Sequence, residues 1–585
     1  MLLTSLRSTT RARLFSRDTA VHPCRVAAAG LASTTKSFQA AVCDENNIWT
    51  STFPPCDASL TQSARFTEFM MKDFQKHGSK LAIRDGVTGE ERSFQDIYED
   101  VHKVGSCMQE EFGIGPNSRV ALFLPNHVDF FTALHGPAKL GATVTPINPA
   151  YREHEVFNQL MSADVRLVVA HPDTVDIARE AAAEKNAEKQ PHEAICQVIC
   201  VSDEFAEMRN GPMPSKLLPD TPVDAEHTLY LPYSSGTTGK PKGVELTHAN
   251  LIWNVLQSHE IDCQFFDEES VVISPLPMFH IYGFLVSVHN CFYHGRPLIT
   301  MKRYDIERFC QLVQDHKVTR AHVVPPILLQ LSKHPVVDNY DMSSLKILQS
   351  AAAPLGPETE KAVRNRLKAD VKQLWGMSEL SPLGTGNPDD RIKAGSAGPP
   401  ISDTQAKVVD VTSGKALGIG EEGELCIRGP QVMKGYLNDV EKTRATLTED
   451  GWLHTGDIAK IDEDGYIYIT DRLKELIKVK GFPVAPAELE AVVFTHPDVI
   501  DTCVIPVPDE EYGEIPRAYV IARHGHGVTE KDIQEYVANL VAPYKKLRGG
   551  VRFVESIPKT DSGKLLRRVL IEQDRKADKQ AQDFK

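Results

Sequence analysis

The sequence predicts an α/β fold, in which a large N-terminal domain of layered α/β subdomains precedes a small α+β C-terminal domain. Three observations support this prediction. The chain has 585 residues, several times the roughly 100 to 200 of one domain. Short apolar runs alternate with longer amphipathic segments over residues 43–470, a pattern typical of a parallel sheet with helical crossovers. Residues 471–572 instead combine long strand-like runs with one amphipathic helix.

The first 42 residues differ in composition from the rest. They contain many Ser and Thr residues and one acid, Asp18, against six basic residues: Arg7, Arg11, Arg13, Arg17, Arg25 and Lys36. A cationic, acid-poor segment is typical of an organelle transit peptide, because a potential that is negative inside attracts it. We expect residues 1–42 to direct the protein to the mitochondrion, with a plastid, or an untargeted tail on a cytoplasmic protein, as alternatives. The last three residues, Asp-Phe-Lys, do not form a peroxisomal signal.

Charge and cysteine content exclude several classes of protein. Lys and Arg number 65 against 79 Asp and Glu, for a formal charge of -14, which argues against a nucleic-acid partner. The eleven cysteines form no CxxC pair, so neither a disulfide framework nor a zinc ribbon is expected. No apolar run reaches 18 residues, so we expect no transmembrane segment. A local basic site remains possible.

The elements of the large domain follow from short apolar runs and their spacing. We expect strands at Val120–Leu124, Ala142–Ile147 and Leu167–Ala170, a helix near Phe66–Phe74, and a solvated helix at Asp176–Glu193. Residues 211–224 contain four prolines and read as a connection between two lobes, because proline does not sustain a helix.

The small domain is predicted from its own signals. Thr529 begins a capping box before an apolar helical face, and Pro543 ends that helix. Asp501–Val507 and Ala518–Ala522 are strand-like. We place this domain at 471–572 and a charged tail at 573–585.

The clearest local motif is Tyr233–Val244, with the sequence YSSGTTGKPKGV. Glycines let backbone amides approach phosphate oxygens, hydroxyls donate hydrogen bonds, and lysines offset negative charge. Ser234 and Pro241 stand where a P-loop needs Gly and Ser or Thr, so this is another kind of polyphosphate loop. The residues that we expect to contact phosphate are Ser234, Ser235, Gly236, Thr237, Thr238, Gly239 and Lys240.

This loop resembles the phosphate-loop signature of the adenylate-forming superfamily, which includes acyl-CoA synthetases, 4-coumarate:CoA ligases, luciferases and the adenylation domains of peptide synthetases. Further blocks resemble that superfamily in the expected order: 275–283, 350–356, 376–379, 452–457, 471–478 and 558–564. The resemblance implies a two-step reaction, in which ATP and a carboxylic acid form an acyl-adenylate and CoA then takes the acyl group. It also implies that the small domain is mobile and rotates at residues 471–474.

The resemblance assigns a nucleotide site. Glu379 matches the metal-associated carboxylate, and a carboxylate suits Mg²⁺. Ser378 replaces the usual Thr and keeps a hydroxyl. Asp457 matches the residue that binds the ribose hydroxyls, and Arg472 is its companion. The residues implied to contact ATP or AMP outside the loop are Ala352, Ala353, Pro354, Trp375, Gly376, Met377, Ser378, Asp457, Arg472 and Lys474.

The resemblance gives catalytic roles to residues of the small domain. Lys564 would bridge the carboxylate and the α-phosphate during adenylation, and a flexible point charge suits that task. Lys478, Lys480 and Gly481 would face CoA after the domain has rotated. One departure is Pro483, where most acyl- and aryl-CoA ligases have Gln, because proline offers neither a side-chain donor nor an N–H.

The acyl pocket is predicted from the block after residue 275. The resemblance places His280 in the wall beside the acyl group, and we also consider it a catalytic candidate. Tyr282, Val323 and Ala351 would complete a mostly apolar cavity. The block contains no Asp to pair an ammonium group, which disfavours an α-amino acid. Coumarate-like aryl acids and medium-chain fatty acids both fit.

The sequence therefore predicts an acid:CoA ligase that uses ATP and CoA as co-substrates and Mg²⁺ as cofactor. Two alternatives follow from the same motifs. One is a luciferase-like oxygenase, which would need oxygen and no CoA. The other is a catalytically weak nucleotide or acyl-adenylate binding protein, suggested by Pro483 alone.

Overall fold

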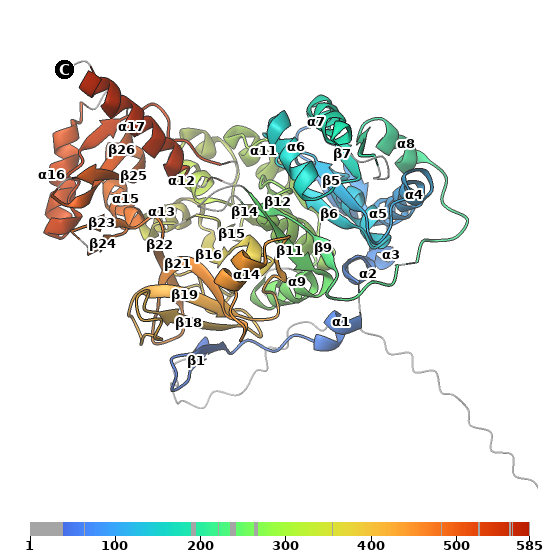
Figure 1. Ribbon diagram of the computed structural model, residues 1–585, viewed down its shortest axis with the longest axis horizontal. Coiled ribbons are helices and arrows are strands. Elements are labelled where there is room, and N and C mark those ends of the chain that lie inside the picture. The colour runs from blue at the N-terminus through green and yellow to red at the C-terminus, as the bar shows by residue number, and fades with distance from the viewer. Residues whose placement is uncertain are drawn as a thin grey trace, which may run out of the picture. The chain divides into compact units, whose positions relative to one another are not determined.

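The computed structural model describes residues 39–63, 65–188, 195–219, 221–234, 241–262, 267–353, 355–480, 482–509, 511–523, 527–560, 563 and 565–583 (Figure 1). They all belong to the compact unit Phe38–Lys585. In this part of the chain the strands form four sheets. The mixed α/β sheets, with a large N-terminal and a small C-terminal domain, confirm the predicted fold class.

The first sheet has eight strands in the order β10-β11-β9-β6-β5-β7-β8, with β20 beside β11. The strands β6, β5, β7 and β8 are mutually parallel, and helices connect them. The strands are β5 Arg119–Phe123, β6 Thr143–Pro146, β7 Leu167–Ala170, β8 Gln197–Cys200, β9 Thr228–Tyr230, β10 Tyr233–Ser234, β11 Lys242–Thr247 and β20 Gly435–Tyr436. The associated helices are α4 Phe94–Phe112, α5 Phe130–Lys139, α6 Glu153–Ser162, α7 Val175–Ala187, α8 Glu204–Asn210 and α9 His248–Asp262.

The second sheet also has eight strands, in the order β17-β16-β15-β14-β12-β13-β3-β4. Its central strands are parallel, and both edge strands are antiparallel to their neighbours. The strands are β3 Leu81–Asp85, β4 Glu91–Ser93, β12 Val272–Ser274, β13 Leu298–Thr300, β14 Arg320–Val323, β15 Ile347–Ser350, β16 Asp370–Gly376 and β17 Leu383–Gly386. Its helices are the π-helix η1 Tyr282–His289, α10 Asn290–Tyr293, α11 Ile306–His316, α12 Pro325–Lys333, the 3₁₀ helices η2 Pro335–Asn339 and η3 Ser378–Leu380, and α13 Pro357–Leu367. Three short helices precede β3: α1 Ala58–Ser63, α2 Phe66–Met71 and α3 Phe74–His77.

A six-stranded antiparallel sheet follows, and its edge comes from the N-terminal part of the chain. Its strands are β1 Ala41–Cys43, β2 Trp49–Ser51, β18 Gln405–Val409, β19 Gly423–Arg428, β21 Leu453–Ile461 and β22 Ile467–Arg472, and α14 Val440–Thr446 precedes β21. Ala41 is fully buried, and the N–H of Ala40 donates to the Asp464 carbonyl at 2.9 Å. Ala41 and Val42, which we had placed in the targeting-like segment, therefore belong to this sheet.

The small domain contains the fourth sheet, of five strands. Figure 1 shows helices α15, α16 and α17 beside β25 and β26. The elements are β23 Ile477–Val479, β24 Phe482–Val484, β25 Val499–Asp509, β26 Gly513–Ala522, β27 Val551–Phe553, α15 Pro486–Phe494, α16 Glu530–Leu540, the 3₁₀ helix η4 Pro543–Lys545 and α17 Arg567–Asp583. The Thr529 capping box is present. The expected tail instead continues α17, where buried Asp574 pairs with Arg517 at 2.7 Å.

Two polar networks lie inside the large domain. Lys372 contacts Asp262 at 2.5 Å and Asp389 at 2.7 Å, and Arg320 contacts the same two carboxylates. All four side chains are at most 1% exposed. Two cations thus neutralise two anions in a fully buried group, which we call the ion quartet.

The second network is a chain of hydrogen bonds through two buried histidines. His289 Nδ1 lies 2.7 Å from the Phe284 carbonyl, which can only accept, so this nitrogen carries the proton. His289 Nε2 then accepts from His135 Nε2 at 3.0 Å, and His135 Nδ1 accepts from the Thr67 hydroxyl at 2.9 Å. Both rings are neutral in this arrangement. Burial lowers the pKa of His289 to about 3 and that of His135 well below its usual value.

Among the helices of the described residues, none combines the length and the apolar character needed to cross a membrane.

Candidate active site

Asp457 is the centre of the predicted ribose site. It lies on β21 and is 4% exposed. Trp375, at the end of β16, donates its indole N–H to Asp457 Oδ2 at 2.8 Å. Arg472, paired opposite Asp457 on β22, places its Nε 3.1 Å from Oδ1. Two donors from different sheets therefore fix this carboxylate, and both partners were predicted to lie in the same site.

The backbone before Asp457 is held by residues that the sequence did not single out. Gly456 has φ +70°, a conformation that glycine adopts without strain. Its N–H donates to Glu424 Oε1 at 3.0 Å, and its carbonyl accepts from the N–H of Leu473 at 2.8 Å. Gly456 thus connects β19 to the segment where we expect the hinge.

Among the described residues, Glu424, Cys426 and His454 form a group of side chains of the types that can bind a metal ion. The other oxygen of Glu424 lies 2.9 Å from His454 Nδ1, and Cys426 Sγ lies 3.6 Å from the same nitrogen. The Glu424 carboxylate is already bonded to Gly456 and His454. This arrangement explains the group as a support for the Asp457 loop.

Glu379 occupies a buried position on the 3₁₀ helix η3, next to the predicted nucleotide site. It is 6% exposed, and the Tyr436 hydroxyl donates to its Oε1 at 2.9 Å. Burial raises the pKa of Tyr436, and the Glu379 charge raises it further. Tyr436 therefore remains a hydrogen-bond donor to this carboxylate at neutral pH.

The turn that carries Met377, Ser378 and Glu379 requires glycine at its start. A Cβ added to Gly376 would lie 2.0 Å from the Pro382 carbonyl oxygen, so any side chain there would displace backbone. The N–H of Met377 donates to the same Pro382 carbonyl at 2.9 Å. Met377 and Ser378 are half-buried beside buried Glu379.

The two ends of the predicted phosphate loop lie on adjacent antiparallel strands. Ser234 pairs with Lys242, and Tyr233 pairs with Gly243. The Lys242 ammonium lies 5.1 Å from the centre of the Tyr436 ring, which joins the loop end to the Glu379 group. Six predicted phosphate residues lie outside the described residues: Ser235, Gly236, Thr237, Thr238, Gly239 and Lys240.

The predicted nucleotide segment after β15 begins in a strained conformation. Ala352 has φ +73°, which costs an L-residue about 1–2 kcal/mol. Ala352 and Ala353 are half-buried, and Pro354 lies outside the described residues. Strain of this kind is often retained at functional sites.

The predicted acyl residues share one apolar region. Tyr282, Val323 and Ala351 belong to the same hydrophobic cluster. The Tyr282 hydroxyl donates to the Gln349 carbonyl at 3.1 Å, so its ring can form a wall while its polar end is already bonded. His280 is half-buried, and its Nδ1 accepts the N–H of Tyr282 at 3.3 Å. A neutral His280 then carries its proton on Nε2.

The contacts described for the predicted lysines Lys478 and Lys480 lie within the small domain. Lys478 is exposed on β23, opposite Pro483 of β24, and its N–H donates to Glu514 at 2.8 Å. Lys480 pairs with Glu511 at 2.6 Å and lies over the Tyr512 ring. Gly481 and Lys564 lie outside the described residues, as do the side-chain surroundings of Pro483.

Gly563, the residue before the predicted Lys564, lies close to the large domain beside the acyl region. A Cβ added to Gly563 would lie 3.1 Å from Pro326 Cγ, at the start of α12, and 3.3 Å from Val324. Gly563 also has φ +79°. Gly563 of the small domain therefore lies against the residues that follow Val323.

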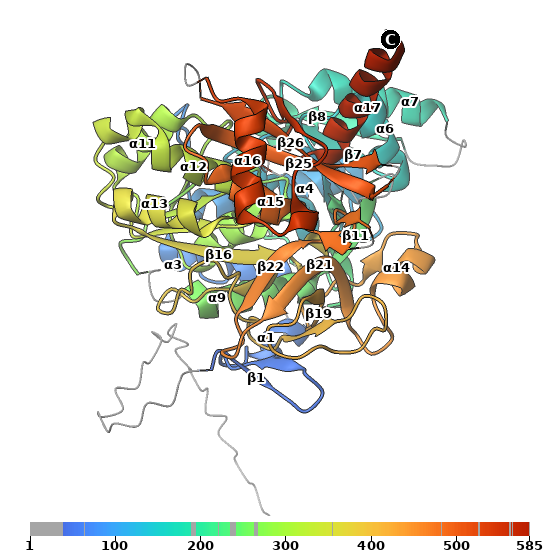
Figure 2. The ribbon, with the colours of Figure 1, turned by 90° about the vertical axis from the view of Figure 1, so that its left-hand side faces the viewer.

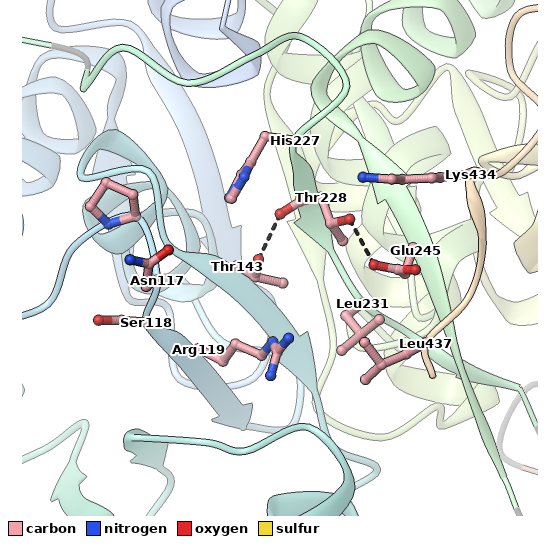
Figure 3. Close-up of a pocket in the computed structure, with 11 residues that line it drawn as sticks. Asn117, Ser118, Arg119, Thr143, His227, Thr228, Leu231, Glu245, Lys434 and Leu437 are labelled. Atoms are coloured by element: carbon pink, nitrogen blue, oxygen red, sulfur yellow. Dashed lines mark hydrogen bonds between the residues drawn. The ribbon is translucent and has the colours of Figure 1, made fainter. Parts of the chain in front are cut away.

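A cavity of about 380 Å³ lies elsewhere on the first sheet and contains none of the predicted site residues. Figure 3 shows Arg119, His227 and Lys434 around it. It is lined at the start of β5, β6 and β9, whereas the predicted phosphate loop follows the end of β9.

Sequence reasoning missed three residues that hold the site: Tyr436, Glu424 and His454. Of the three, only His454 lies in one of the motifs named above, at 452–457. Their roles depend on contacts between strands that are distant in sequence, so residue type alone gives no signal for them.

Comparisons with known proteins give the family. Residues 71–437 match the model of the AMP-binding enzyme family, and residues 488–564 match the model of the AMP-binding enzyme C-terminal domain. The chain is 39% identical over 540 residues to 4-coumarate–CoA ligase 2 of Petroselinum crispum, covering 90% of this chain and 96% of that protein. It is 39% identical over 536 residues to 4-coumarate–CoA ligase of Pinus taeda, covering 88% and 96%.

Solved structures agree in fold. ATP-bound MatB from Rhodopseudomonas palustris is 26% identical, with a TM-score of 0.77 over 87% of this chain and 98% of that one. The two family models match a part of each of the two domains. The chain therefore belongs to the AMP-binding enzyme family.

Proposed function

We propose that the protein is an AMP-forming acid:CoA ligase, which activates a hydrophobic carboxylic acid with ATP and transfers the acyl group to CoA. The observation that carries this function is the extent of similarity to 4-coumarate–CoA ligases, which covers 90% of this chain and 96% of the relative. The match therefore includes the small domain as well as the large one, as a two-step reaction requires.

In the first step a carboxylate oxygen attacks the α-phosphorus of ATP, the bond to the β-phosphate breaks, and pyrophosphate leaves. Asp457, with both oxygens oriented by Trp375 and Arg472, accepts hydrogen bonds from the ribose hydroxyls. The phosphate loop and Lys242 face the triphosphate, and Lys564 brings a positive charge to the two reacting anions. Such positioned charges stabilise the transition state most where water is excluded.

Mg²⁺ fits the donor set at Glu379. The buried carboxylate accepts one hydrogen bond at Oε1, from Tyr436, and oxygen ligands are those that Mg²⁺ prefers. Glu379 would hold the ion together with phosphate oxygens. When bound, Mg²⁺ neutralises charge on the phosphates.

In the second step the CoA thiol attacks the acyl carbonyl and AMP leaves. Lys478 and Lys480 are exposed on the small domain, so a rotation at residues 471–474 can present them to the adenylate while it withdraws Lys564. The bond between Leu473 and Gly456 places the start of that rotation next to the ribose site.

The substrate is an aryl acid of the coumarate type or a medium-chain fatty acid. The wall residues Tyr282, Val323 and Ala351 belong to an apolar cluster, which favours a hydrophobic acyl group. The relatives named as 4-coumarate–CoA ligases favour the aryl acid.

We further propose a mitochondrial location, from the basic composition of residues 1–38. Fusion of this segment to a fluorescent protein tests it, and diffuse cytoplasmic signal would contradict it.

The experiment for the main proposal measures pyrophosphate release and acyl-CoA formation by residues 39–585 with cinnamic, benzoic and C4 to C16 acids. We expect acyl-CoA from one acid class, with AMP and pyrophosphate in equal amounts. Product formed without CoA and only with oxygen would favour the oxygenase. ATP binding without turnover of any acid would favour the binding protein.

A further inference from the structure

The three side chains that support the Asp457 loop also have the composition of a metal site. Glu424 and Cys426 lie two residues apart on β19, and strand geometry turns such a pair to one face of the sheet. His454 on β21 pairs directly with Cys426, and Figures 1 and 2 both show these two strands side by side. One ligand atom from each residue lies within 4.8 Å of the other two. We call these three residues the Glu-Cys-His triad.

The spacing of the ligand atoms is close to that of a tetrahedral Zn²⁺ site. Zn–N and Zn–S bonds of about 2.0–2.1 and 2.3 Å place N and S about 3.5–3.6 Å apart at the tetrahedral angle. Cys426 Sγ lies 3.6 Å from His454 Nδ1. The same construction places N and O about 3.4 Å apart, against 2.9 Å between His454 Nδ1 and Glu424 Oε2. An ion therefore needs about 0.5 Å more room on this side, and rotation of the His454 ring can supply it because this side chain is 38% exposed.

The protons of the triad can be accounted for when a metal ion binds. Glu424 keeps the Gly456 N–H on Oε1 and offers Oε2, which now accepts from His454 Nδ1. A neutral His454 binds the ion through Nδ1 and keeps its one proton on Nε2. Burial, and then the charge of Glu424, raise the pKa of the Cys426 thiol to about 12. The thiol therefore keeps its proton until a metal ion replaces it, and binding releases that one proton.

We propose that the Glu-Cys-His triad is a Zn²⁺ site, with three protein ligands and a water molecule in the fourth position. Thiolate, imidazole and carboxylate together suit Zn²⁺, whereas Mg²⁺ prefers oxygen ligands alone. The site is therefore separate from the carboxylate of Glu379. The ion would enter past His454, since Cys426 is fully buried behind it.

The Zn²⁺ site would lie directly beside the loop that carries Asp457. The Gly456 N–H donates to Glu424 Oε1, and the Gly456 carbonyl accepts from Leu473. Coordination at Oε2 leaves this connection in place and adds bonds between β19 and β21. Bound Zn²⁺ would thereby stiffen the backbone between the predicted ribose site and the segment where we expect the hinge. The metal site itself does not depend on the proposed ligase activity.

The test uses Co²⁺ as a spectroscopic substitute for Zn²⁺ on the full chain, without nucleotide. A bond between thiolate and Co²⁺ gives a charge-transfer band in the near ultraviolet, and a tetrahedral Co²⁺ site gives visible bands. We expect both sets of bands, with one Co²⁺ bound per chain. An equimolar amount of Zn²⁺ should remove the bands by displacing Co²⁺, whereas a large excess of Mg²⁺ should not.

Variants assign the ligands. C426S should abolish the near-ultraviolet band and weaken Zn²⁺ binding at least about tenfold, because even the outer-shell partners of a metal contribute that much. H454Q should weaken Zn²⁺ binding by a similar factor and keep the near-ultraviolet band at saturation. It changes a partly exposed side chain, so it tests the site if C426S does not fold. C43S is the matched control, because Cys43 is another free cysteine of the same sheet, on β1.

Three outcomes would overturn the inference: no near-ultraviolet band in the unmodified protein, a band that persists in C426S, or Zn²⁺ binding by H454Q as tight as in the unmodified protein. Loss of the band in C43S would also contradict it, by placing the thiolate ligand elsewhere. Thermal unfolding is a second readout, since a ligand of the folded state raises the melting temperature. Zn²⁺ should raise that of the unmodified protein and C43S, and not that of C426S.

Discussion

The residues of the predicted ribose site and the lysines of the small domain differ in burial and in how their side chains are fixed. Asp457 is buried, and Trp375 and Arg472 fix its two oxygens. Lys478 and Lys480 are exposed, and the bonds described for them stay within the small domain. The first group is therefore preorganised for one ligand geometry. The lysines of the second group can reach the site in one conformation of the small domain and leave it in another. A reaction of two steps in one site needs such a change.

The largest effect is expected from removing the preorganised carboxylate. D457A should lower the rate of acid-dependent pyrophosphate release without CoA about 10²–10³-fold, because two hydrogen bonds to a charged acceptor are lost. D450A is the control, since Asp450 is exposed in the turn before β21. A loss below tenfold with an unchanged melting temperature would mean that Asp457 does not bind the nucleotide.

Gly563 tests whether the small domain acts separately in each step. G563A should slow adenylation about tenfold, because a Cβ would meet Pro326 at 3.1 Å and φ is +79°. The thioester step, measured from supplied acyl-adenylate, should remain within twofold. G527A is a matched control, since Gly527 has φ +66° with open space around it. Equal slowing of both steps would show that the loop contact is not specific to adenylation.

We expect acid to lower the stability of the large domain, which contains His135 and His289. His135 and His289 have a lowered pKa in the folded large domain, whereas both would titrate near 6.5 when unfolded. The unfolded state then binds more protons below pH 6.5, so this stability is present above pH 6.5 and is lost as pH falls toward 3. The expected loss is about 1.4 kcal/mol per pH unit for each histidine.

Urea unfolding of H135F between pH 6 and 4 checks this expectation. The slope of its free energy of unfolding against pH should correspond to about one proton fewer than in the unmodified protein. H154Q, at an exposed histidine, should keep the original pH dependence. An unchanged dependence in H135F would place the acid sensitivity elsewhere.

The smallest effect concerns strain inside the preorganised half. Ala352 has φ +73°, and Ala353 does not have positive φ. A352G should change the free energy of unfolding by less than about 1 kcal/mol in the stabilising direction, and A353G should destabilise by about 0.5–1 kcal/mol. Equal destabilisation by both changes would show that Ala352 stores no strain.

Much of the large domain could be predicted because its signals are local. Leu167–Ala170 is a strand with the predicted bounds, since a short run of branched apolar residues is buried on both faces. The Thr529 capping box also formed as predicted. The meeting of Asp457 and Trp375 could not come from spacing, because 82 residues separate them, and only the family resemblance brought them together.

Predictions from local sequence were wrong where contacts between residues distant in sequence oppose the local composition. The basic segment that we placed at 1–42 includes Ala41, which is buried in the third sheet, because pairing of β1 with distant strands outweighs composition. In α17 the charged sequence suggested a solvated tail, yet Asp574 turns inward to Arg517 and Arg552. A charged residue becomes a core residue there because its partners lie on β26 and β27.

The ion quartet has a consequence for how this enzyme can diversify. Replacing any one of Asp262, Asp389, Arg320 or Lys372 leaves an uncompensated buried charge, which costs several kcal/mol. Arg320 also donates to the Gln349 side chain at 3.1 Å, and the backbone carbonyl of Gln349 accepts from the Tyr282 hydroxyl. Evolution can therefore alter this side of the acyl region only through paired substitutions, whereas residues without such partners can drift one at a time toward a new acid.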